Sequence, residues 1–149
     1  MDLEDTKDIL SKLGFVIESI TPPDPEHFGN WVMFATRPPV ALRVINDRGV
    51  VHRDLAEITA FKSGAKESDW FNWDVVARAF GIKDDTFWTV SHVSPIVLSN
   101  ELVSFARSFE IIESAFRADY WKSTLDRLHK IEADKRRRFM EGRRAFVAT

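Results

Sequence analysis

Side chains that could do acid–base chemistry stand close together at one place in the sequence. His52 and Asp54 are separated by one residue in the segment 50–55, which has the composition of a β-strand. Alternate residues of a strand point to the same face, so an imidazole and a carboxylate would meet there. General acid–base catalysis would need this pair in a cleft beside a nucleophile, and Ser91 and Ser94 lack the Gly-x-Ser-x-Gly context of an activated serine. We therefore expect half-exposed strand polarity here and no enzymatic activity.

No motif for metal, nucleotide or thiol chemistry stands in the sequence. The histidines are far apart and form neither His-x-His nor His-Glu-x-x-His, and the six glycines build no phosphate-binding loop. The absence of cysteine excludes disulfides, thiolate catalysis and thiolate metal ligands together. We expect no cofactor and no metal site. The four histidines are His27, His52, His92 and His129.

Length and composition indicate one folded domain over residues 1–149. Hydrophobic residues make up 44% of the chain and charged residues 30%, which excludes a disordered tail. No apolar stretch approaches the roughly 20 residues that span a bilayer, so we expect no membrane partner. The first residues are acidic and do not resemble a secretory signal. These features predict a cytoplasmic protein.

The net charge of −2 hides an asymmetry between the two ends of the chain. Residues 1–30 carry two lysines against seven acids, a net charge of −5, whereas residues 133–144 carry a net charge of +4. The two ends could attract each other or serve different partners. The alternative function that follows is a nucleic-acid-associated regulator binding phosphates through its basic C-terminal helix. The cations concerned are Lys135, Arg136, Arg137, Arg138, Arg143 and Arg144.

The pattern of apolar residues predicts an α+β fold: an N-terminal helix, a three- to four-stranded antiparallel meander, then three helices. The first helix would end at Gly14, and strands are expected near 15–20, 31–35, 40–45 and 50–55. The prolines after Thr21 predict an extended loop rather than a strand. We expect Gly49 to close the last hairpin in a type I turn. The sheet-forming part covers about 15–56.

A change to helical periodicity marks the second half, about 69–144. Trp73, Val76, Ala77 and Phe80 lie on one helical stripe, with Asp69 or Asn72 as its cap and Gly81 at its end. A third helix is expected from about Asn100 to Phe116 and a fourth after Asp119, whose apolar stripe fades beyond Ile131. The C-terminal turns would then be a solvated or partner-binding extension.

Two kinds of residue are candidates for binding a partner. A turn at Gly29 and a charged hairpin tip at Asp47 could form recognition loops, and arginine is enriched among interface hot spots. A second candidate is an aromatic cluster that exceeds what one short helix can bury, and surface aromatics are enriched at protein interfaces. The five residues of this cluster are Trp70, Phe71, Trp73, Phe87 and Trp88. The candidate partner-binding residues are Phe28, Asn30, Arg48, Trp70 and Phe71.

An ordered set of short motifs follows the chain: His-Phe-Gly-Asn at 27–30, Asn-Asp-Arg-Gly at 46–49, Asp-Trp-Phe at 69–71 with Asp74, and Ala-Phe-Gly at 79–81. The match that they define covers roughly residues 13–81. The set resembles a group of small bacterial proteins with a Ser-Phe-Gly-Asn-like segment, a strand pair around Asp-Arg-Gly and a helix led by Glu-Trp-Phe. His27 stands where that group has serine, Asp69 stands where it has glutamate, and the C-terminal helical half has no counterpart in it. The resemblance implies a strand-then-helix order, and it offers no catalytic residue that could be carried over to this chain.

Some proteins of this kind are thought to be immunity or accessory proteins of toxin systems. Together with the lack of catalytic motifs, this resemblance predicts a protein-binding, immunity-like inhibitor or adaptor that acts by surface complementarity. The expected partner is another protein, such as a toxin, and the chain would be a monomer or a homodimer.

Overall fold

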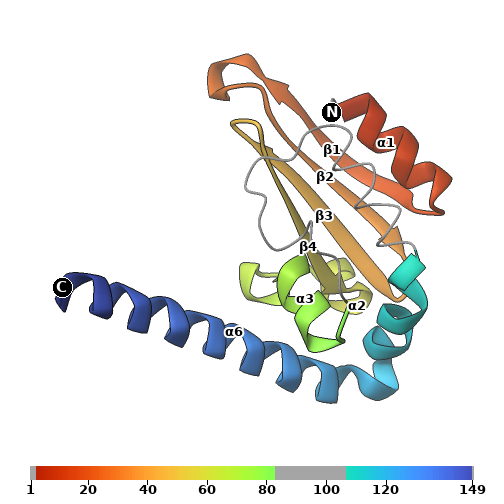
Figure 1. The fold of residues 1–149 in the computed structure, drawn as a ribbon. Helices are drawn as coiled ribbons and strands as arrows, with labels where there is room; N and C mark the ends of the chain where they lie inside the picture. The colour runs from red at the N-terminus through yellow and green to blue at the C-terminus, as the bar shows by residue number, and fades with distance from the viewer. Residues whose placement is uncertain (1–2, 83–106, 149) are drawn as a thin grey trace.

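The fold is α+β, as the sequence predicts: an N-terminal helix, an antiparallel sheet and then helices (Figure 1). The structure is a computed structural model that describes residues 3–82 and 107–148. Residues 107–116 are helical and lead into the last helix. The remaining elements are α1 (Leu3–Lys12), β1 (Val16–Asp24), the 3-10 helix η1 (Pro25–His27), β2 (Asn30–Arg37), β3 (Val40–Asp47), β4 (Val50–Glu57), α2 (Ile58–Lys62), the 3-10 helix η2 (Glu67–Asp69), β5 (Phe71–Asn72), α3 (Trp73–Ala79) and α6 (Ala118–Ala148).

The sheet has five strands in the order β1-β2-β3-β4-β5, one more than the meander we expected, because the short β5 joins the end of β4. The expected loop after Thr21 is instead part of β1, which continues through Pro22 and Pro23 to Asp24. The strand tolerates these prolines because it lies at the edge of the sheet and its pairing with β2 is irregular between Thr21 and Asp24.

The turn between β3 and β4 also differs from the expected type I turn. Asp47 pairs with Val50, so only Arg48 and Gly49 form the loop, and both have positive φ, 54° and 82°. Positive φ at both central residues is the pattern of a type I′ turn, whose twist matches that of the two strands it joins. Arg48 therefore adopts a left-handed conformation that is uncommon for a residue with a β-carbon.

The two faces of the sheet have separate apolar clusters. Alternate residues of β3, among them Leu42 and Val44, face the main core under α1, α3 and the C-terminal helices. The intervening Ala41 faces the other side, where Ala56 and Trp70 form a smaller cluster. Arg43 follows the same alternation and therefore lies on the side of this smaller cluster.

The C-terminal half behaves partly as expected. Asn72 caps α3 by accepting a hydrogen bond from the backbone N–H of Asp74, and Phe109, Ile112 and Phe116 are buried in the core. The first part of the expected third helix lies outside the described residues. Asp119 is not the cap of α6, because the helix begins one residue earlier, at Ala118.

The last helix α6 packs against α3 and then continues well past it (Figure 1). Leu128 is fully buried, whereas every side chain from 136 to 144 is exposed. The stretch 136–144 is called the free end of α6. Among the described residues, no helix combines the length and apolar composition that crossing a bilayer requires.

Candidate protein-binding site

Asn30 joins two connections of the sheet that are distant in sequence. Its side-chain oxygen accepts a hydrogen bond of 2.8 Å from the backbone N–H of Arg48, and its side-chain nitrogen donates one of 3.0 Å to Asp47 Oδ1. The β1–β2 connection and the β3–β4 turn therefore meet at one end of the sheet. Phe28, Asn30, Asp47 and Arg48 are called the sheet tip.

The sheet tip presents an aromatic ring and a guanidinium together. The Arg48 guanidinium carbon lies 4.7 Å from the centre of the Phe28 ring, which is cation–π geometry. Both side chains are 71% exposed. Phe28 and Arg48 are also the two non-glycine residues with positive φ in the described part of the chain, at 61° and 54°.

The backbone before Phe28 is fixed by local hydrogen bonds. Asp24 caps η1: its carboxylate accepts from the backbone N–H of Glu26 and lies 2.5 Å from His27 Nδ1. Its backbone oxygen accepts a 2.7 Å bond from the N–H of Gly29. Phe28, with its left-handed backbone conformation, thus lies inside a hydrogen-bonded turn. Its ring points outward and does not pack in the core.

Trp70 and Phe71 do not belong to this surface. They are 8% and 0% exposed. The sequence suggested that both side chains bind a partner, but the structure places both in apolar clusters inside the protein. Trp70 packs with Phe34 and Phe61 in the smaller cluster, and Phe71 packs against Trp121. The aromatic residues at 87 and 88 lie outside the described residues.

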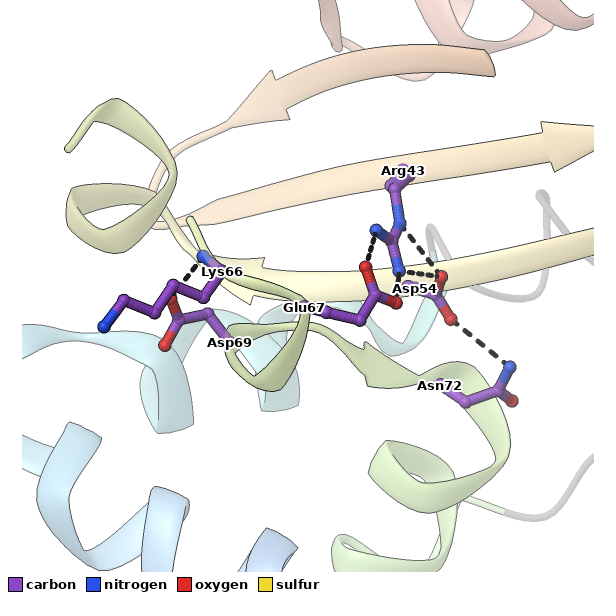
Figure 2. Close-up of polar contacts among 6 residues, drawn as sticks. All are labelled: Arg43, Asp54, Lys66, Glu67, Asp69 and Asn72. Carbon is purple, nitrogen blue, oxygen red and sulfur yellow. Dashed lines mark hydrogen bonds and ion pairs between the residues drawn. The ribbon is translucent and has the colours of Figure 1, made fainter. Parts of the chain in front are cut away.

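A second polar cluster, called the arginine bridge, lies beside Trp70 and consists of Arg43, Asp54, Glu67 and Asn72 (Figure 2). Arg43 donates to both Glu67 oxygens at 2.8 Å and to Asp54 Oδ2 at 2.8 and 3.1 Å. Asn72 donates to the other oxygen of Asp54 at 3.3 Å. The guanidinium carbon also lies 4.8 Å from the centre of the Trp70 ring. Every nitrogen of the guanidinium has an acceptor, so the cluster fastens η2 and β5 to the sheet.

The charges of the arginine bridge stabilise each other. Burial lowers the pKa of Arg43, but its hydrogen bonds to Glu67 and Asp54 outweigh that effect and hold the pKa above its ordinary value. Hydrogen bonds from Arg43 lower the pKa of Glu67, with burial acting in the opposite direction. Both groups therefore stay ionised over a wide pH range.

The structure does not bring His52 and Asp54 together as a catalytic pair. His52 is exposed, whereas Asp54 is buried and its carboxylate is held by Arg43 and Asn72. Ser91 and Ser94 lie outside the described residues. Within residues 3–82 and 107–148, no three histidine, aspartate or glutamate side chains are placed to hold a metal ion.

The six cations in residues 135–144 of α6 divide into two groups. Lys135 pairs with Asp74, Arg137 with Asp134 and Glu141, and Arg138 with Asp134. The other three cations have no acidic partner among the described residues: Arg136, Arg143 and Arg144. The free end of α6 lies far from α1, so the basic end does not contact the acidic N-terminal helix within one chain (Figure 1).

The sequence reasoning identified three of the four sheet-tip residues as partner-binding candidates but missed the arginine bridge. A signal for the bridge exists. Arg43 is the only charge in the apolar segment 40–45, and a buried charge needs a partner. A two-residue turn at 48–49 places Asp54 directly opposite Arg43, as the register shows. Glu67 could not be identified in this way, because the chain between β4 and β5 is irregular.

Comparison with known proteins gives no relationship from which a role could be transferred. No protein family model, no curated protein and no solved structure matches the chain.

Proposed function

We propose that the protein acts by binding another protein through the sheet tip, without catalysis. The observation that carries the proposal is the outward Phe28 ring under the Arg48 guanidinium, both exposed and both held in a left-handed backbone conformation. Such a conformation costs about 1–2 kcal/mol per residue with a β-carbon. Strain of this kind clusters at functional sites.

The chemistry of the sheet tip suits a protein surface. Arginine is among the residue types that dominate interface energies, and Phe28 adds aromatic area whose burial would be gained only on binding. The hydrogen bonds of Asn30 fix the two loops relative to each other before binding, which lowers the entropy cost of association. An immunity-like inhibitor of a toxin is the form of this proposal that the sequence resemblance suggests.

The first experiment is affinity capture of the tagged protein from its host lysate, with and without nuclease, followed by titration calorimetry with the purified partner. Phe28→Ala and Arg48→Asn should each weaken binding by about tenfold or more, because hot-spot truncations cost at least about 1–2 kcal/mol. Arg48→Asn creates an Asn-Gly turn, which favours the observed positive φ values, so its folding should be at least as stable as that of the wild type.

The matched control is Tyr120→Ala, which removes an aromatic side chain that is 60% exposed on α6, away from the sheet tip. Its affinity should equal that of the wild type. If Phe28→Ala and Arg48→Asn bind as the wild type does, the partner uses another surface and the sheet tip is not the site.

A further inference from the structure

The free end of α6 extends away from the domain after its first residue, Arg136, which lines a cleft with Trp70 and Asn72. Figure 1 shows α6 leaving the body of the domain after its contact with α3. All nine residues of the free end, 136–144, are exposed. Phe139 is 68% exposed there, and Met140 beside it is about half exposed.

Three arginines that have no acidic partner among the described residues lie near this exposed ring. Arg136 and Arg143 are seven residues apart, or about two turns and 10 Å along the helix, so they lie on the same side. Phe139 is three residues after Arg136 and four before Arg143, which places the ring on that side between them. Arg144 extends the positive surface toward Met140, four residues before it. The remaining arginines of this stretch, Arg137 and Arg138, form ion pairs with Asp134 and Glu141.

We propose that this surface binds single-stranded nucleic acid, with Arg136, Arg143 and Arg144 contacting phosphates and Phe139 stacking on a base. Arginines that neutralise phosphates, combined with an aromatic platform for unpaired bases, are the features by which proteins bind single strands. The proposal is independent of the sheet tip, which lies on the connections β1–β2 and β3–β4.

The arrangement fits other occupants less well. A helix that docks in a protein groove presents apolar anchors three, four and seven residues apart. Phe146 is seven residues after Phe139, but Gly142 and Arg143 occupy the positions three and four after Phe139. A membrane-surface helix needs a broad apolar face, whereas six of the nine residues 136–144 are charged. In a double-stranded nucleic acid the bases stack on each other, so none would be free to stack on the Phe139 ring.

The net charge of −2 for the whole chain does not oppose this binding. The acidic segment 1–30 includes α1, which Figure 1 places far from the free end of α6. Exposed charges are largely screened beyond a Debye length of about 8 Å at physiological salt. A polyanion bound at the free end therefore interacts mainly with Arg136, Arg143 and Arg144, and little with the distant acidic residues.

The test is fluorescence anisotropy with a labelled mixed-sequence single strand of about 12 nucleotides, titrated with full-length protein. Three phosphate contacts predict a slope of about −2 for log K against log salt. Affinity should then fall about 20-fold between about 50 and 200 mM salt. The triple variant Arg136→Gln, Arg143→Gln, Arg144→Gln should lose both the binding and the slope.

A matched control and a ring variant separate the two contributions. Lys12→Gln, Lys122→Gln, Lys130→Gln removes the same charge from exposed positions elsewhere and should keep wild-type affinity and slope. Phe139→Ala should weaken binding about 5- to 150-fold while leaving the slope unchanged, because stacking does not release counterions.

Several results would overturn the proposal. If no binding is seen at low salt, or if the affinity does not change with salt, the proposed phosphate contacts do not exist. An equal loss in the control triple variant would show a general charge effect without a site. Tighter binding to a duplex of the same length with no effect of Phe139→Ala, or tighter binding to anionic lipid vesicles, would assign the surface to another ligand.

Discussion

Arg43 shows how a single charged residue in an apolar strand organises its surroundings. Its side chain is nearly buried, and an unpaired charge there would be strongly destabilising. Asp54 is equally buried and lies opposite it in the register of β3 and β4. Glu67, by contrast, keeps 83% of its side chain exposed while forming a bidentate pair with the guanidinium. The two partners should therefore contribute differently to stability.

The pairing with Glu67 predicts a pH-dependent difference between the wild type and Glu67→Gln. Because Arg43 lowers the pKa of Glu67 in the folded state, the pair stabilises the fold above the unfolded pKa of about 4.3 and is lost as the pH falls through the folded value. Glu67→Gln should be less stable near pH 7 by under about 1 kcal/mol, since the pair is solvent-screened, and the difference should vanish near about pH 2.

Urea unfolding at a series of pH values measures this difference. The control is Glu110→Gln, on the exposed surface of the helix 107–116. Its stability should differ less from that of the wild type than the stability of Glu67→Gln does. Asp54→Ala should lower the free energy of unfolding at neutral pH by about 3–5 kcal/mol, several times more than Glu67→Gln. The reason is that it removes the buried carboxylate to which the Arg43 guanidinium donates two hydrogen bonds. A pH-independent deficit in Glu67→Gln would show that the ion pair contributes no charge-dependent stability.

At the scale of elements, α6 combines a buried half and a free half that depend on different forces. Leu128 is packed in the core, whereas the free end is held mainly by backbone hydrogen bonds and by pairs three and four residues apart, such as Arg137 with Glu141. Isolated helical turns with so few contacts are marginal in water. A substitution that changes the helix propensity of a residue in the free end should therefore change the measured helicity of the protein.

Gly142 tests this dependence, because a β-carbon at this position would meet no atom within 4 Å. Gly142→Ala should favour the last turns of α6 by up to about 1 kcal/mol, raising helicity in far-ultraviolet circular dichroism and slowing amide exchange after residue 138. The reverse change Ala133→Gly, at an exposed position of the same helix, should lower helicity. Reduced helicity in Gly142→Ala would mean that another segment approaches Gly142 closely.

The elements were easier to predict from the sequence than their contacts. The stripe from Trp73 to Phe80 and the caps around it follow from local chemistry alone, and α3 forms where they indicate. The strand path through Pro22 and Pro23 was missed because local propensity does not reveal that β1 is an edge strand. The burial of Phe71 was missed for a similar reason, since it depends on Trp121, fifty residues later in the chain.

The candidate site shows the same limit. Phe28, Asn30 and Arg48 were identified by their turn chemistry, but the sequence gives no spacing rule that would join two separate loops. Only the pairing of β2 with β3 brings Asn30 beside Asp47, because Trp31 lies opposite Asn46 in the register. Likewise, the run of cations on α6 is visible in the sequence, whereas its division into paired and unpaired arginines requires the side-chain geometry.

For the whole molecule, the two proposed surfaces lie on separate elements and are not linked by contacts among the described residues. The sheet tip is held by hydrogen bonds within the strand connections, whereas the free end of α6 begins at Arg136, which lines a cleft with Trp70. Sites that share no partners usually contribute additively to stability and binding. Each surface should therefore be removable without loss of the other.

A chain that ends at Lys135 tests this independence. It retains Leu128 in the core and the ion pair between Lys135 and Asp74, so its melting temperature should fall by less than about 4 °C, which corresponds to about 1 kcal/mol. It should keep wild-type affinity for the protein partner in calorimetry and lose single-strand binding in anisotropy. The complementary variant, Phe28→Ala in the full chain, should give the reverse pattern. If the shortened chain also binds the protein partner more weakly, that partner contacts both the sheet tip and α6, and the two surfaces form one interface rather than two.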